Sequence, residues 1–188
     1  MAYDTQTFLK KVTIFCDTAE QKNAHIIDAL EQMKVAHEEK NLLFGDYSFS
    51  VDGRDFSLSC VIERKANIEE LYGNLTHDRD RLEREFRAAS ATAKDFSLLV
   101  ENCAGIDAMR HYRLSDYVMR RDRRKVQNIG TFCYTTVQSW QAGNRYNFMT
   151  IYVQNPADTA ARMVEHFYYF WRNFKKLTAN RKNMRKPG

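Results

Sequence analysis

The stretch Val61-Ile62-Glu63-Arg64-Lys65 ends an apolar run of β-strand character with one acid and two bases. Because side chains alternate between the two faces of a strand, Glu63 and Lys65 should point the same way and Arg64 the opposite way. A carboxylate beside an ammonium group at a strand end can belong to a metal and phosphate site. A surface ion pair is the alternative, and the neighbouring segments bear on the choice.

A β-hairpin is predicted immediately before this strand end. Residues 47–51 and 56–62 are its expected arms, and Asp52-Gly53 is a strong turn signal between them. Asp46 opens the first arm and Glu63 closes the second, so antiparallel pairing would bring the two acids together. Mg²⁺ and Mn²⁺ prefer such oxygen ligands, and magnesium sites commonly combine one or two carboxylates with a substrate phosphate. We therefore predict a divalent-metal site here.

Two further acids follow the first predicted strand, at 12–16. Asp17 closes this strand and Glu20 comes one helical turn later. Ligands collect at strand ends in open α/β sheets, which would add both acids to the cluster. The alternative is helix capping, because Thr18 and Gln21 have the spacing of a capping box. We expect the first helix to begin at Thr18.

The remaining chain alternates between strand and helix patterns, with an uncertain region at 106–125. This order predicts the α/β class, with a mixed central β-sheet flanked by helices. One domain is expected over 12–177, after a loose lead-in at 1–11 and before a basic tail at 178–188. Further strands are expected at 35–41, 96–100 and 148–153, and helices at 66–71, 78–92, 131–142 and 156–177.

Composition restricts the class of protein. A length of 188 residues suits one domain with a full core, and the net charge of +5 favours an anionic partner such as nucleic acid. The sequence shows neither the apolar core of a signal peptide nor an apolar run long enough for a membrane span. Since the cysteines indicate no disulfide framework, we expect a reducing compartment, the cytoplasm of a bacterial or phage-infected cell or the nucleus of a eukaryotic one. The cysteines lack zinc-finger spacing and are interpreted as small buried thiols; they are Cys16, Cys60, Cys103 and Cys133.

The motifs Gly45-Asp46-Tyr47 and Glu63-Arg64-Lys65, preceded by Asp17-Thr18-Ala19-Glu20, resemble the signature of XPF-type structure-selective endonucleases. This family belongs to the PD-(D/E)XK nuclease superfamily, which has a restriction-endonuclease-like core. The resemblance implies Mg²⁺ as cofactor, with Mn²⁺ as a substitute, and branched, flap or junction DNA as substrate. It also implies a homodimer.

The resemblance assigns roles to individual residues. Asp46 and Glu63 are implied metal ligands, with Asp17 as a third, and Lys65 is implied to be catalytic. Glu20 and Arg64 are implied to support the site.

Three departures from the family pattern affect these implications. Ala19 stands where many members carry Arg, and Glu69 and Glu70 stand where an Asp usually follows the second motif. The tandem helix-hairpin-helix domain that often follows is absent, so selection of branched DNA has less support than cleavage. A domain of this size by itself is similar to phage and bacterial members.

Basic residues supply candidate DNA contacts, although a solvated, salt-bridged helix face is the alternative for those at 79–87. The aromatic run 166–171 is expected to pack rather than stack on bases, and its excess over one core face suggests a dimer. Two other functions stay open: a non-catalytic DNA-binding partner subunit, and a restriction-like or RNA-directed nuclease. The candidate DNA-binding residues are Arg81, Arg84, Arg120, Arg121, Arg123, Arg124 and Lys125.

Overall fold

The computed structural model describes residues 3–115, 126–143 and 145–184, with side chains from residue 5 to residue 180 outside those gaps. Its centre is one mixed β-sheet in the order β2-β1-β3-β5-β6-β7, with β4 paired to β3. Strand β1 is parallel to β2, and β5, β6 and β7 are parallel to one another. The strands are β1 (Val12–Asp17), β2 (Ala36–Lys40), β3 (Tyr47–Val51), β4 (Arg54–Asp55), β5 (Cys60–Lys65), β6 (Asp95–Glu101) and β7 (Met149–Val153).

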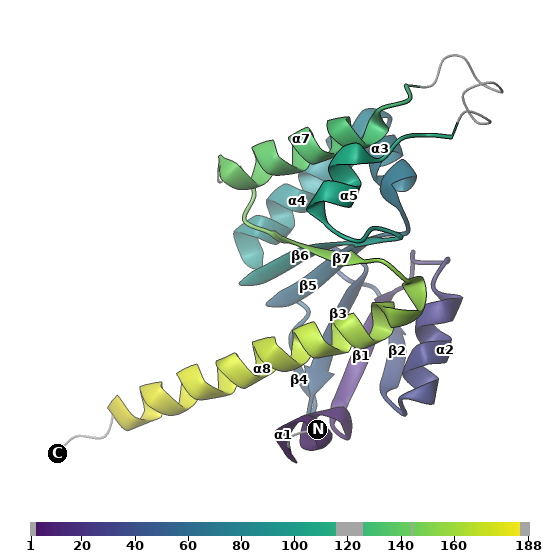
Figure 1. Ribbon diagram of the computed structural model, residues 1–188. Coiled ribbons are helices and arrows are strands. Elements are labelled where there is room, and N and C mark those ends of the chain that lie inside the picture. Colours follow the sequence, from purple (N-terminus) through teal and green to yellow (C-terminus); the bar gives the residue numbers. More distant parts are fainter. Residues whose placement is uncertain (1–2, 116–125, 144, 185–188) are drawn as a thin grey trace.

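Helices cover both faces of this sheet (Figure 1). The helices α3, α4, α5 and α7 lie on one face, and α8 crosses the other face beside α1 and α2. The helices are α1 (Tyr3–Leu9), α2 (Ala24–Gln32), α3 (Ile68–Thr76), α4 (Arg79–Thr92), α5 (Ile106–His111), α7 (Ile129–Ala142) and α8 (Thr159–Met184), the last preceded by the 3₁₀ turn η1 (Pro156–Asp158). Within these ranges, no helix combines the length and the apolar character that crossing a membrane requires.

The two covered faces produce two hydrophobic cores, and β5 contributes to both. Ile62 packs in the core beneath α8, whereas Val61 packs in the core beneath α3 and α4. A strand buried on both faces has a continuous apolar run rather than an alternating pattern, as Cys60-Val61-Ile62 shows in the first half of β5. The predicted α/β class, with its mixed central sheet, is confirmed.

The predicted hairpin turn is present, but the prediction of a continuous second arm at 56–62 is wrong. Asp52 and Gly53 both have positive φ angles, 50° and 73°, as a type I′ turn requires. The chain then pairs only briefly as β4 before leaving the ladder, and β5 starts at Cys60. Phe56 still donates its backbone N–H to the carbonyl of Phe49 (3.0 Å), and a turn at 57–59 then interrupts the arm, with the N–H groups of Ser59 and Cys60 donating to the carbonyl of Phe56 (2.7 and 2.9 Å).

Two predictions for the N-terminal region are wrong, the loose lead-in and the helix start at Thr18. The expected loose lead-in contains α1, because Phe8 is fully buried and its ring centroid lies 5.2 Å from that of Trp171. The first helix after β1 begins at Ala24 rather than at Thr18. At the other end, α8 continues to Met184, into the segment expected as a basic tail.

Candidate active site

Gly45 determines how closely the Gly45-Asp46-Tyr47 motif approaches β5. Its φ angle is +71°, in the region that favours glycine, and a Cβ atom there would lie 2.3 Å from Cγ1 of Val61. This close approach lets the backbone N–H of Asp46 donate to the carbonyl of Ile62 (2.9 Å). The backbone N–H of Arg64 in turn donates to Oδ2 of Asp46 (2.6 Å). The Asp46 carboxylate is therefore fixed at the end of β5.

Glu63 and Lys65 lie on the same face of β5, as strand alternation predicts. Nζ of Lys65 donates to Oε1 of Glu63 at 2.6 Å, and both side chains are buried. Burial, followed by the negative charge of Glu63, raises the pKa of Asp46 well above its usual range. Burial opposes protonation of Lys65, but the Glu63 and Asp46 carboxylates together raise its pKa above the ordinary lysine value.

The donor set of this cluster suits a hard divalent cation. Within the described part of the chain, Oδ1 of Asp46 and Oε2 of Glu63 make no hydrogen bond, so each carboxylate has an oxygen available. Burial and the repulsion between the two negative charges both disfavour the ionised form of Asp46. A bound cation would offset that repulsion. The residues therefore fit Mg²⁺ or Mn²⁺ by donor type and by charge.

Arg64 points to the opposite face, where it enters a buried ionic network. Its Nη2 donates to Oε2 of Glu101 at 2.7 Å, and its Nη1 donates to Oε2 of Glu20 at 3.4 Å. Oε1 of Glu101 accepts a hydrogen bond from Thr159 Oγ1 (2.6 Å) and lies 2.8 Å from Nε2 of His25. Although burial opposes ionisation, these partners hold the pKa of Glu101 below its usual value.

Three members of this network were not predicted as site residues. Glu101 offered a signal, because it is an acid at the end of a buried strand that runs parallel to β5. His25 and Thr159 offered none, because they approach Glu101 from positions 76 and 58 residues away in the sequence.

Asp17 and Glu20, the two acids that follow β1, have different partners in the structure. Oδ1 of Asp17 accepts from the backbone N–H of Leu42 (2.8 Å) and Oδ2 accepts from that of Ala19 (3.0 Å). These bonds anchor the loop after β1 and explain why no helix starts at Thr18. Glu20 joins Arg64, and its charge contributes to the raised pKa of Asp46. Glu20 therefore contacts Arg64 on the other face and acts on Asp46 only through its charge, whereas Asp17 holds the adjoining backbone.

Other acids surround the site on its helical side. Burial and the charge of Glu63 raise the pKa of Glu85, a residue of α4, although Arg81 pairs with it at 2.8 Å. Glu70 accepts from the backbone N–H of Ala66 (2.8 Å), just before α3, and its own N–H donates to the side chain of Asn67, which caps the helix (2.8 Å). Glu69 accepts from the Tyr112 hydroxyl (2.8 Å).

The predicted DNA-binding residues fall into two groups. Arg81 and Arg84 are exposed on α4, close in sequence to Glu85. The five others lie outside the residues that the structure describes; they are Arg120, Arg121, Arg123, Arg124 and Lys125.

Comparison with known proteins gives a consistent result. The model of the ERCC4 domain family matches residues 16–165. XPF from Aeropyrum pernix is similar in structure, with 18% identity and a TM-score of 0.56 over 84% of this chain and 60% of that chain. XPF from Aeropyrum pernix in complex with DNA is similar at 17% identity and a TM-score of 0.56, over 86% of this chain and 65% of that chain.

The chain thus spans less than two thirds of the XPF chains that it matches. A search of curated proteins gave no match. The family model nevertheless covers most of the sequence, and the structural match agrees with it. The chain therefore belongs to the ERCC4 domain family and contains an XPF-type nuclease domain.

Proposed function

We propose that this chain is a divalent-metal-dependent endonuclease that hydrolyses phosphodiester bonds in DNA, at branched, flap or junction structures. The observation that carries this proposal is the convergence of Asp46, Glu63 and Lys65 at the end of β5. This arrangement joins two carboxylates and one ammonium group, which is the chemistry needed to bind a cation beside a phosphate.

Each residue of the cluster has a distinct role in this proposal. Asp46 and Glu63 would hold Mg²⁺ or Mn²⁺, which when bound would supply positive charge for the scissile phosphate and make water more acidic. Lys65 remains protonated beside Glu63 and donates to a phosphate oxygen as negative charge develops there. Water attacks phosphorus and loses one proton to solvent, the P–O bond to the leaving sugar oxygen breaks, and that oxygen takes a proton from solvent, so one water is consumed for each bond cut.

The residues on the other face position this cluster. Arg64 forms part of the backbone between Glu63 and Lys65, and its N–H holds Asp46. Its guanidinium is fixed by Glu101 and Glu20, which limits movement of β5 at the site. Glu20 also adds negative charge near Asp46, which favours cation binding.

The substrate class rests on two supports. The net charge of +5 favours a polyanion. One of the similar structures is described as an XPF complex with DNA. Selectivity for branched DNA and assembly as a homodimer rest on the family resemblance and stay predictions. Light scattering of the full chain, with and without DNA, checks the dimer.

Cleavage of end-labelled DNA tests the proposal directly. Linear duplex, flap, splayed-arm and four-way-junction substrates are incubated with Mg²⁺ or with EDTA. Wild type is compared with Glu63→Gln, which keeps the side-chain shape but removes the charge, and with Glu39→Gln, an exposed acid on the edge strand β2.

We expect metal-dependent cutting of branched DNA by wild type and Glu39→Gln, and a loss of at least about 100-fold in Glu63→Gln. Equal cutting of linear duplex would refute selectivity but retain the chemistry. DNA binding without cutting in Mg²⁺ or Mn²⁺ would refute the enzyme and favour a non-catalytic partner subunit.

A further inference from the structure

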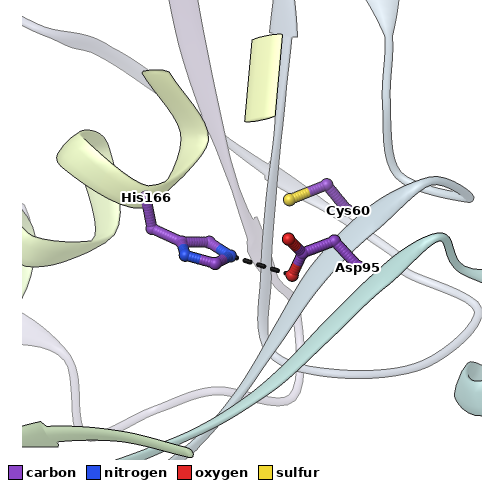
Figure 2. A group of neighbouring side chains, drawn as sticks. All are labelled: Cys60, Asp95 and His166. Carbon is purple, nitrogen blue, oxygen red and sulfur yellow. Dashed lines mark hydrogen bonds and ion pairs between the residues drawn. The ribbon is translucent and has the colours of Figure 1, made fainter. Parts of the chain in front are cut away.

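A second cluster of metal-binding side-chain types lies at the far end of the same strands. Cys60 begins β5 and Asp95 begins β6, and the two are direct partners in the parallel ladder. Glu63, Lys65 and Glu101 lie toward the other end of these strands. His166, from α8, faces the pair (Figure 2). The cluster is therefore separate from the proposed catalytic site.

The three side chains converge on one point. One sulfur, one carboxylate oxygen and one imidazole nitrogen all lie within 4.8 Å of one another. Nε2 of His166 is 2.9 Å from Oδ1 of Asp95, and Figure 2 shows the Cys60 sulfur on the side of Asp95 that faces the ring. Among the residues that the structure describes, no other group of three or more potential metal ligands lies this close together.

We propose that Cys60, Asp95 and His166 form a binding site for a thiophilic divalent metal, with Zn²⁺ as the best fit. Sulfur, imidazole nitrogen and carboxylate oxygen are the three protein ligand types of zinc. Mg²⁺ is excluded by the same chemistry, because it prefers oxygen ligands only. The two proposed metal sites therefore select different ions.

The spacing suits zinc. Bonds from zinc to sulfur are about 2.3 Å and those to nitrogen or oxygen about 2.0–2.2 Å, so ligand atoms around one tetrahedral ion lie roughly 3.5 Å apart. The three ligand atoms lie within 4.8 Å of one another, so they would have to come closer together when the ion binds. Ser97 Oγ donates to Oδ1 of Asp95 (3.2 Å), and such an outer hydrogen bond orients a ligating carboxylate.

An open pocket borders two members of the cluster, Asp95 and His166. It has a volume of about 350 Å³, and its lining includes Asp95, His166, Lys94 and Met149. A tetrahedral ion needs a fourth ligand, which water in this pocket can supply. Cys60 itself is fully buried, so the metal would be held between the sheet and the pocket.

Chemistry other than metal binding fits this cluster less well. The Cys60 side chain is fully buried, so a Cys-His-Asp catalytic arrangement, which needs a nucleophile that substrate can reach, is disfavoured. A hydrogen bond between His166 and Asp95 accounts for two members of the cluster but leaves the direction of the sulfur unexplained.

The test is a Zn²⁺ titration of the full chain against a chromophoric chelator, in excess Mg²⁺ to occupy the carboxylate pair. We expect one equivalent to bind, with affinity lowered at least about 100-fold in Cys60→Ser and in His166→Gln. Cys133→Ser is the matched control, because Cys133 is an equally buried free cysteine on α7. The Zn²⁺ affinity of Cys133→Ser should equal that of wild type.

Cobalt provides a second readout that identifies the ligand. Co²⁺ bound at this site should give a thiolate charge-transfer band, which Cys60→Ser loses and Glu63→Gln keeps. Loss of Zn²⁺ binding in Glu63→Gln, or equal affinity in wild type and His166→Gln, would overturn the proposal. If Cys60→Ser does not fold, His166→Gln decides, because His166 is partly exposed at the pocket.

Discussion

The guanidinium of Arg64 and the carboxylate of Glu101 lie 2.7 Å apart, both nearly inaccessible to solvent, on the face of the sheet opposite Asp46 and Glu63. Breaking a buried pair leaves one charge without compensation. We expect Glu101→Gln to lower the free energy of unfolding by about 3 kcal/mol, measured by urea denaturation.

The control for this pair is Glu165→Gln. Glu165 pairs with Arg162 on the exposed face of α8 at 2.5 Å, and about half of each side chain is exposed. Its loss should cost less than about 1 kcal/mol. Equal effects of the two variants would contradict the view that the Arg64–Glu101 pair is a structural element of the site.

Gly45 gives a second prediction. Gly45→Ala introduces both a strained positive φ angle and a clash with Val61, so it should destabilise the fold by about 2–4 kcal/mol. Gly53→Ala is the matched control, because Gly53 has a similar φ angle of +73° but open space around it. It should cost only about 1 kcal/mol. A smaller loss for Gly45→Ala than for Gly53→Ala would show that the close approach to β5 is unimportant.

The raised pKa of Asp46 predicts a pH dependence in EDTA. At pH values between the ordinary aspartate pKa and the raised one, Asp46 keeps its proton in the folded state and loses it in the unfolded state. The resulting stability is present below the ordinary aspartate pKa and is lost as pH rises through the elevated folded pKa, about 1.4 kcal/mol for each unit of elevation. Asp46→Asn should flatten this decline, measured by urea unfolding from about pH 4 to about pH 9.

Mg²⁺ should reverse the decline in wild type, because the cation replaces the proton, and it should leave Asp46→Asn unchanged. The control is Asp28→Asn, which removes an exposed acid of α2. If Asp46→Asn declines with pH as steeply as wild type and the control, the electrostatic account of the site is incorrect.

Lys65→Met tests the role of the ammonium group. We expect DNA cleavage to slow by about 10²–10³-fold with little change in DNA affinity, because the lost interaction strengthens only as phosphate charge develops. The measurement is single-turnover cleavage of the preferred substrate. Lys176→Met on α8 is the control and should cut normally. A defect in binding alone would assign Lys65 to substrate attraction.

The local part of the site could be predicted from sequence. The opposite directions of Glu63 and Arg64 follow from the period of a strand, and the approach of Asp46 to Glu63 follows from the hairpin turn at Asp52-Gly53. These features depend on residues at most 18 positions apart, where backbone geometry limits the alternatives.

The remaining features depend on tertiary packing. The start of α2 could not be predicted, because the Asp17 carboxylate bonds to Leu42, 25 residues away, instead of capping a helix at Thr18. Glu101 and His25 meet only once α2 packs on the sheet. Cys60 and His166 have no zinc-finger spacing, since the ladder and α8 bring them together.

Strand β6 touches α8 at both of its ends. Glu101 accepts from Thr159 in the first turn of the helix, and Asp95 bonds to His166 about two turns later. A helix attached at two points can neither slide by one turn nor rotate about its axis without breaking a contact. The end of α8 that projects past the sheet in Figure 1 therefore extends from a helix that is held at two points, and a force on it would act first on β6, whose Glu101 pairs with Arg64 of β5.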